Sequence, residues 1–159
     1  MAKALDIPDL DADTRFGEAA ARAVEVRTQE LFGRAEGVLD LDDIERVHDM
    51  RVASRRLRAV LEIFAPCFPR RQLRSALKDV KRLADALGER RDPDVAVASL
   101  EQLGTSLASE DAPGLDSLIA ALNSERRGAN EHLAATLEEA ERAGLAVRLM
   151  ALGAEARRV

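Results

Sequence analysis

The sequence predicts an all-α protein, an antiparallel bundle of four to five helices in one domain. Three observations predict this fold class. Alanine, leucine and arginine, which are good helix formers, dominate the composition, and the chain has no tryptophan or tyrosine. Apolar residues recur at helical spacing, and no segment shows the alternation that is typical of a strand. Glycines and prolines divide the chain into segments of helical length.

Residues 1–12 lack helical periodicity and are expected to form a flexible lead-in, so that residues 13–159 make up the helical domain. The first helix is predicted over residues 14–36. Gly37 is its expected end, because glycine readily takes the left-handed conformation that follows a helix. The residues expected on its inward face are Phe16, Ala20, Ala23, Val24, Leu31 and Ala35.

The second predicted helix follows the acidic residues 40–43, which supply N-cap candidates and a favourable charge at a helix start. It ends near Phe64, where two prolines follow. Pro69 suits the first turn of a third helix, which is expected to end at Gly88. The inward residues of this third helix are Leu73, Ala76, Leu77, Val80, Leu83, Ala84 and Leu87.

The pair Asp92 and Pro93 matches an N-cap followed by proline at the first helical position. It predicts a separate short helix over residues 93–103. The apolar members of that helix are Val95, Ala98 and Leu103.

The rest of the chain is predicted as a loop and two more helices. The loop covers residues 104–113, a long helix covers residues 114–143, and Gly144 separates it from a last helix over residues 145–157. The leucines expected to face inward from the long helix are Leu115, Leu118, Leu122, Leu133 and Leu137.

Charge is unevenly distributed along the chain. Residues 46–91 contain 13 Lys and Arg against 5 Asp and Glu, a local charge of +8. The whole chain has 24 basic and 29 acidic residues, so the remainder has 11 basic against 24 acidic, or −13. An acidic protein that concentrates its basic residues in under a third of its length is expected to bind an anionic partner there.

Two helices in this block each carry a stripe of cations. At about 100° per residue, His48, Arg51, Arg55 and Arg58 fall within an arc of about 80°, next to the apolar face. The third helix repeats the pattern with cations between Arg71 and Arg82. The residues predicted to bind the anion are His48, Arg51, Arg55, Arg58, Arg74, Lys78, Lys81 and Arg82. The additional candidates are Arg56, Arg71, Arg91 and Arg126.

Each of these features also has a purely structural interpretation. Arginine stripes on helices commonly form solvated faces or salt-bridge ladders, and a histidine such as His48 commonly has a structural role. Arg91, beside Asp92, can hold a loop by an ion pair or contact a ligand. The acidic residues expected to orient neighbouring cations are Asp49, Asp79, Asp85 and Glu89.

The block resembles the conserved histidine α-helical domain family, usually called CHAD. The matching residues are Val47-His48-Asp49-Met50-Arg51-Val52, Arg55-Arg56-Leu57-Arg58, Phe64, Lys78, Lys81-Arg82-Leu83, Leu87-Gly88, Arg91-Asp92 and Asp94. The weaker patterns of the first helix and of residues 114–143 also fit, so the resemblance covers most of the chain. It implies a helical bundle that binds inorganic polyphosphate on a basic surface and does not process it.

One departure from the family affects the expected assembly. The family usually carries two such helical halves in one chain, related by an approximate twofold axis, and this sequence carries one. No second His-x-x-Arg block follows, since His132 is followed by Leu133, Ala134 and Ala135. Two chains could rebuild the symmetry as a homodimer, which light scattering at micromolar concentration would test. A working monomer is the alternative.

Two other classes of anionic partner are considered beside polyphosphate. Single-stranded nucleic acid is disfavoured because its sites commonly add aromatic platforms for base stacking, and the chain has only 4 phenylalanines. Backbone binding to a nucleic-acid duplex needs charge alone. A protein-interaction module for an acidic partner would capture that protein but have no affinity for phosphate polymers.

No motif indicates catalysis, a cofactor or a metal site, because the chain has no P-loop, HExxH or pair of metal-ligand histidines. We therefore expect no enzyme activity. The single cysteine, Cys67, fits a reducing cytoplasm, and an association with polyphosphate granules would agree with the implied ligand. No apolar run is long enough to span a membrane. Through His48, binding is expected to tighten as the pH falls from about 8 to about 6.

Overall fold

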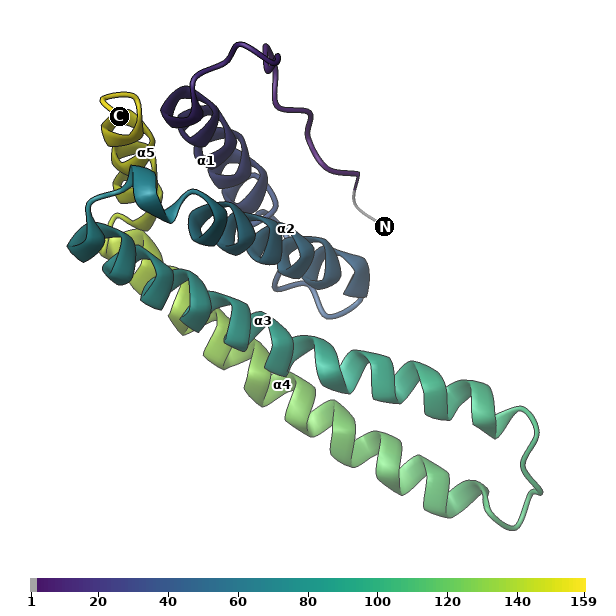
Figure 1. The fold of residues 1–159 in the computed structure, drawn as a ribbon. Helices are drawn as coiled ribbons and strands as arrows, with labels where there is room; N and C mark the ends of the chain where they lie inside the picture. The colour runs from purple at the N-terminus through teal and green to yellow at the C-terminus, as the bar shows by residue number, and fades with distance from the viewer. Residues whose placement is uncertain (1–2) are drawn as a thin grey trace.

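The computed structural model describes residues 3–159, and this part of the chain contains five α-helices, one short 3₁₀-helix and no strand (Figure 1). The all-α fold class is therefore confirmed. The elements are α1 (Phe16–Phe32), α2 (Ile44–Ile63), η1 (Ala65–Cys67), α3 (Arg70–Gly104), α4 (Ala112–Arg142) and α5 (Leu145–Ala156).

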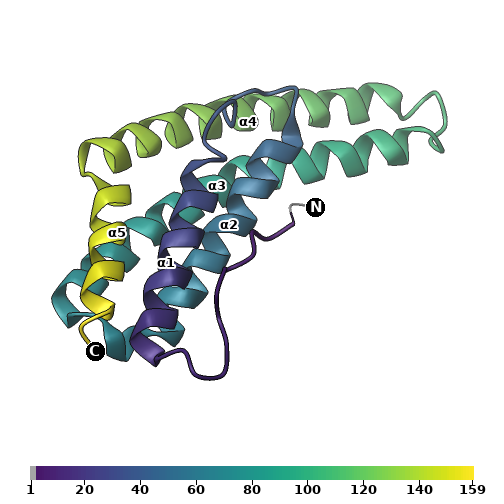
Figure 2. The ribbon, with the colours of Figure 1, turned by 90° about the horizontal axis from the view of Figure 1, so that it is seen from above.

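The core lies where α1, α2 and α5 pack with the N-terminal half of α3 and the C-terminal end of α4. Helix α1 lies between α2 and α5, and α3 packs against α2 on one side and α4 on another (Figures 1 and 2). Leucines from all five helices are completely buried, and each contributes about 1.5–3 kcal/mol by leaving water. These leucines include Leu31, Leu57, Leu83, Leu133 and Leu149.

The predicted division of α3 is wrong, because Arg70–Gly104 is one continuous helix of 35 residues. Gly88 does not end it, and Asp92 does not cap a new helix. Pro93 is buried inside the helix, where it lacks the N–H that would bond to the preceding turn. Packing of this turn against α4 offsets that loss and overrides the local signal for a helix start.

The side-chain assignment for this segment is also corrected. Val95 and Leu103, expected to face inward, each have an exposed fraction of 50%, whereas Val97 is buried. Ala98 is exposed as well. The register of a continuous α3 places Val97, rather than these residues, against α4.

The distal halves of α3 and α4 extend beyond the rest of the molecule as a two-helix arm (Figure 1). Residues 92–125, which form this arm with its connecting loop, contain 7 acidic residues and no basic one. Leu118, predicted to face inward, has an exposed fraction of 49% because no third helix covers this part of α4. Leu115 and Leu122 are half-buried between the two helices.

Helix α1 is shorter than predicted and ends at Phe32, four residues before the expected end at Glu36. Phe16, expected inside, has an exposed fraction of 55% and its ring lies 4.9 Å from that of Phe64. Gly37 lies in the following loop with a φ of 71°, a conformation that favours glycine.

The predicted limits of the other helices agree with the structure to within a few residues. Helix α2 follows the acidic residues 40–43, and α4 begins after the loop that was predicted over residues 104–113. Gly144, with a φ of 61°, separates α4 from α5 as expected. Within residues 3–159, no helix is both long enough and apolar enough to cross a membrane.

Residues 3–12 lie outside the helices but contact α1. Arg22 donates a hydrogen bond to the backbone oxygen of Asp9 at 2.7 Å, and Arg27 donates one to the backbone oxygen of Leu5 at 2.8 Å. The lead-in therefore follows α1 along its arginine-bearing side.

Candidate functional site

The first cationic stripe lies along α2, on the side next to α3. His48 and Arg51 are half-buried, and Arg55 and Arg58 are exposed. The Arg51 side chain extends over α3, because its Nε would lie 3.7 Å from a Cβ placed on Gly88. Hydrogen bonding to Glu62 raises the pKa of Arg58, and the charge of Asp85 on α3 contributes in the same direction. The stripe thus runs along the boundary between the two helices.

The second stripe lies on the outer face of α3. Arg74, Lys78 and Lys81 are all exposed there, at the three- and four-residue spacing that places side chains on one helix face. Because α2 packs against α3, the two stripes lie on adjoining helices. We call the surface formed by these seven side chains the α2–α3 basic surface. Its members are His48, Arg51, Arg55, Arg58, Arg74, Lys78 and Lys81.

Five cations of this surface have no carboxylate partner. Within residues 3–159, no ion pair is made by Arg51, Arg55, Arg74, Lys78 or Lys81. Like charges this close repel one another by a few tenths of a kcal/mol per pair. A protein of net charge −5 thus concentrates unpaired cations on two adjoining helices, and an anion bound there would relieve their repulsion.

Many arginines elsewhere in the molecule have carboxylate partners. Arg157 binds Glu25 at 2.6 Å, and Arg22 binds Glu18 at 2.7 Å. Glu30, which is almost completely buried, lies against Arg27 and Arg56. The cations outside residues 46–91 that make no ion pair within the described chain are far apart in sequence. They are Lys3, Arg15, Arg127 and Arg142.

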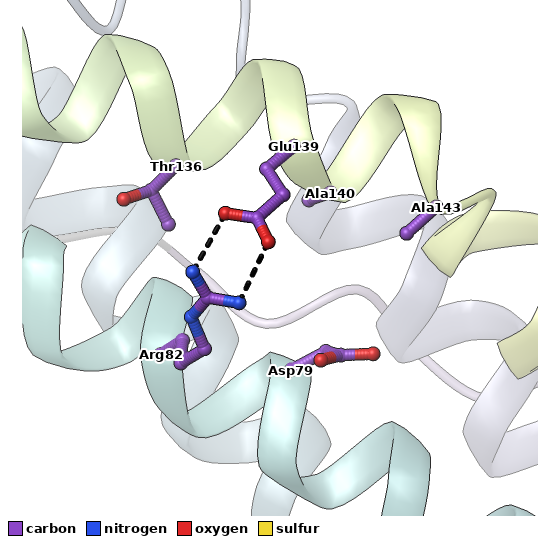
Figure 3. A pocket seen from close by; sticks show the side chains of 6 residues that line it. All are labelled: Asp79, Arg82, Thr136, Glu139, Ala140 and Ala143. Atoms are coloured by element: carbon purple, nitrogen blue, oxygen red, sulfur yellow. Dashed lines mark hydrogen bonds and ion pairs between the residues drawn. The ribbon is translucent and has the colours of Figure 1, made fainter.

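Arg82 follows Lys78 by four residues, so it lies at the edge of the second stripe, where α3 meets α4. Its guanidinium donates two hydrogen bonds to Glu139, at 2.9 and 2.6 Å, in the paired geometry that suits a carboxylate or a phosphate (Figure 3). Both side chains are about half exposed, so solvent and salt weaken the pair. Two of the eight predicted site residues therefore already have an acidic partner. Arg82 pairs with Glu139 of α4, and Arg58 pairs with Glu62 of its own helix at 2.8 Å.

Three of the additional candidates are held by the fold. Arg56 faces α1, where Glu30 accepts its hydrogen bond at 2.6 Å. Arg91 donates to the backbone oxygen of Ile44 at 3.2 Å, which ties α3 to the start of α2. Arg126 lies 3.6 Å from Asp94. The fourth, Arg71, is exposed and makes no ion pair within the described chain.

Three of the four acidic residues that were predicted to orient neighbouring cations, Asp49, Asp79 and Glu89, contact basic side chains. Asp79 binds Arg148 of α5 at 2.7 Å, and Glu89 lies 3.8 Å from His132 of α4. Asp49 lies 3.2 Å from Arg34 of α1. These three contacts connect α2 and α3 to α1, α4 and α5, whereas Asp85 and Glu62 act on Arg58 of the α2–α3 basic surface.

A buried ion pair lies near the middle of α3. Arg90 and Asp94 are both inaccessible to solvent, with Nη1 and Oδ2 2.6 Å apart. The contact is an ion pair and not a well-aimed hydrogen bond, because neither Nη atom is directed at an acceptor of the described chain. Arg90 Nε donates to Asn130 Oδ1 at 3.0 Å, and Asn130 donates to the backbone oxygen of Leu39 at 3.0 Å. This network joins α3, α4 and the loop before α2.

No group of three or more His, Cys, Asp or Glu side chains in residues 3–159 is arranged to hold a metal ion. Cys67 is buried, and its burial raises the pKa of the thiol.

A family model described as the CHAD domain matches residues 22–158, which is nearly the whole chain. No curated protein matches the sequence.

Proposed function

The chain belongs to the CHAD domain family, and from that premise we propose that it binds inorganic polyphosphate along the α2–α3 basic surface without processing it. The observation that carries the proposal is the set of five cations on two packed helices that have no carboxylate partner within residues 3–159. Guanidinium groups form paired, charge-assisted hydrogen bonds to phosphate oxygens, and ammonium groups neutralise them as point charges.

The composition of the surface fits a ligand that has phosphates and no bases. Within residues 3–159, no aromatic side chain belongs to either cationic stripe. Phe68 is buried, and Phe64 is half-buried at the end of α2. A site for single-stranded nucleic acid would gain about 1–3 kcal/mol from each stacked base, and this surface offers no such platform.

The test is a titration with long-chain polyphosphate, with RNA and heparin as competitors and salt as the second variable. The logarithm of the affinity falls with the logarithm of the salt concentration, with a slope of about −0.7 per phosphate contact. If each of the five unpaired cations contacts one phosphate, the affinity should fall by about 100-fold between about 50 and about 200 mM salt. RNA that competes as well as polyphosphate would favour nucleic-acid backbone binding. Capture of an acidic protein without affinity for polyphosphate would favour the interaction module. Phosphate released in the presence of Mg²⁺ would contradict a purely binding role.

Glu139 gives a sharper prediction, because it occupies the Arg82 guanidinium that a phosphate would use. Glu139→Gln should raise the affinity for polyphosphate by about tenfold, since one more cation becomes available and one negative charge is removed. The slope of log affinity against log salt concentration should become steeper by about 0.7. Isothermal titration of wild type and variant at several salt concentrations measures both quantities.

Lowering the pH to 6 is not expected to release Arg82 from Glu139. The hydrogen bond and charge of Arg82 lower the pKa of Glu139 below its ordinary 4.5, so the carboxylate stays charged until the pH falls through that lowered value. The matched control is Glu155→Gln, which removes the carboxylate partner of Arg158 instead. An equal gain in both variants would mean that only net charge matters, and no gain in Glu139→Gln would place Arg82 outside the site.

A further inference from the structure

A cavity of about 550 Å³ lies between the N-terminal part of α3 and α5. Its polar wall is formed by Arg71, Gln72 and Ser75 from α3 and by Arg148 from α5, over an apolar floor that includes Ala76 and Leu152. Four side chains that can donate hydrogen bonds therefore converge on one cavity. Arg148 and Ser75 were not among the sequence-predicted candidates.

Arg148 is held in place from two sides. Its Nη1 donates to Asp79 Oδ2 at 2.7 Å, and its Nη2 donates to Ser75 Oγ at 2.7 Å. A guanidinium has five N–H donors, so these two bonds fix its plane and leave donors for a ligand. The side chain is 35% exposed, which keeps those donors accessible. Asp79 is not part of the cavity wall, so its charge lies behind the guanidinium.

Arg71 connects this cavity to the α2–α3 basic surface. It is exposed, makes no ion pair in residues 3–159, and precedes Arg74 and Lys78 by three and seven residues on α3. That spacing places all three on one face of the helix, over about 10 Å. The line of unpaired cations therefore leads from the open surface of two helices into a cavity.

A linear polyphosphate has two kinds of phosphate that match these two environments. An internal phosphate shares two of its oxygens with its neighbours and carries one negative charge. A terminal phosphate has three free oxygens and a second ionisation near neutral pH, so it carries more charge and accepts more hydrogen bonds. Guanidinium groups, a hydroxyl and an amide arranged around a cavity suit such a group better than a helix face does.

We propose that the cavity between α3 and α5 binds the terminal phosphate of a polyphosphate chain, with Arg71 and Arg148 as the charged donors. The proposal rests on the proposed function, because it assigns the chain end to this cavity and the internal phosphates to the α2–α3 basic surface.

The experiment uses tripolyphosphate, in which most of the phosphates are terminal. It also uses short-chain polyphosphate in two forms, one with free ends and one with both terminal phosphates blocked as phosphoramidates. Arg71→Gln should weaken tripolyphosphate binding by about tenfold, through the loss of one charge-assisted hydrogen bond. Blocking the ends should weaken binding to wild type by a similar factor and have little effect on Arg71→Gln. Arg148→Gln should behave like Arg71→Gln but also lose the contact with Asp79.

The matched control is Arg142→Gln, which removes another exposed arginine without an ion pair in the described chain and should bind like wild type. Arg71→Gln keeps the test valid if Arg148→Gln fails to fold. Equal binding of free-ended and blocked chains, or of tripolyphosphate to Arg71→Gln and wild type, would overturn the cavity assignment while polyphosphate binding stands. Tripolyphosphate binding that needs Arg71, in a protein without affinity for long chains, would support the cavity and contradict the α2–α3 basic surface.

Discussion

Replacing Arg55, Lys78 and Lys81 together by glutamate should lower the affinity for long-chain polyphosphate by about 1000-fold. Each reversal removes one attraction and adds one repulsion, and about 1.4 kcal/mol per site corresponds to about tenfold each. All three side chains are exposed and make no ion pair in residues 3–159, so the fold loses no contact with a carboxylate. The unfolding free energy should therefore change by no more than about 0.5 kcal/mol per site.

The control for this experiment is a triple reversal elsewhere. Arg15, Arg127 and Arg142 are also exposed and without an ion pair in the described chain, and their replacement by glutamate changes the net charge by the same amount. Titration at one salt concentration compares the two variants directly. A similar loss in both would show that polyphosphate responds to the total charge of the molecule and has no defined binding surface.

Asp94→Ala should destabilise the protein by about 3–5 kcal/mol, because it leaves the guanidinium of Arg90 buried without its carboxylate. Arg90 and Asp94 both have an exposed side-chain fraction of 0%, so water does not replace the lost partner. Domains of this size are stable by only about 5–15 kcal/mol, and the variant should unfold at a much lower urea concentration than wild type.

Two further variants test whether the loss of stability comes from the unpaired guanidinium of Arg90. Asp92→Ala, two residues away and exposed, should change the unfolding free energy by no more than about 0.5 kcal/mol. The double variant Arg90→Met with Asp94→Leu should recover much of the loss, because it replaces both buried charges with apolar side chains. A loss below about 1 kcal/mol in Asp94→Ala would show that Arg90 finds water or another acceptor.

The sequence predicted the helices well wherever local signals and packing agree. Gly144 ends α4 both in the sequence pattern and in the structure, because its positive φ is a local property of the residue. Asp92 and Pro93 gave a local signal of the same strength, yet α3 continues through them. There the deciding contacts come from Arg126 and Asn130 of α4, which are distant in the sequence and give no local pattern.

The same distinction applies to the candidate site. Helical periodicity is sufficient to place Arg51 and Arg55 on one face of α2. It does not show which cations already have partners, because Arg82 and Glu139 are 57 residues apart and Asp79 and Arg148 are 69 apart. The cavity beside α5 was missed for that reason. Its two arginines, Arg71 and Arg148, are 77 residues apart in the sequence, and only the folded structure brings them together.

The two-helix arm has a consequence for how the molecule meets a polymer. Residues 92–125 have 7 acidic residues and no basic one, whereas the rest of the chain has 24 basic and 22 acidic residues, so negative charge is concentrated on the arm. If the chain binds polyphosphate as proposed, the polyanion is expected to approach the α2–α3 basic surface and to be repelled by the arm. Under the same proposal, copies that bind one polymer are expected to repel one another through their acidic arms, which would set a minimum spacing along the strand.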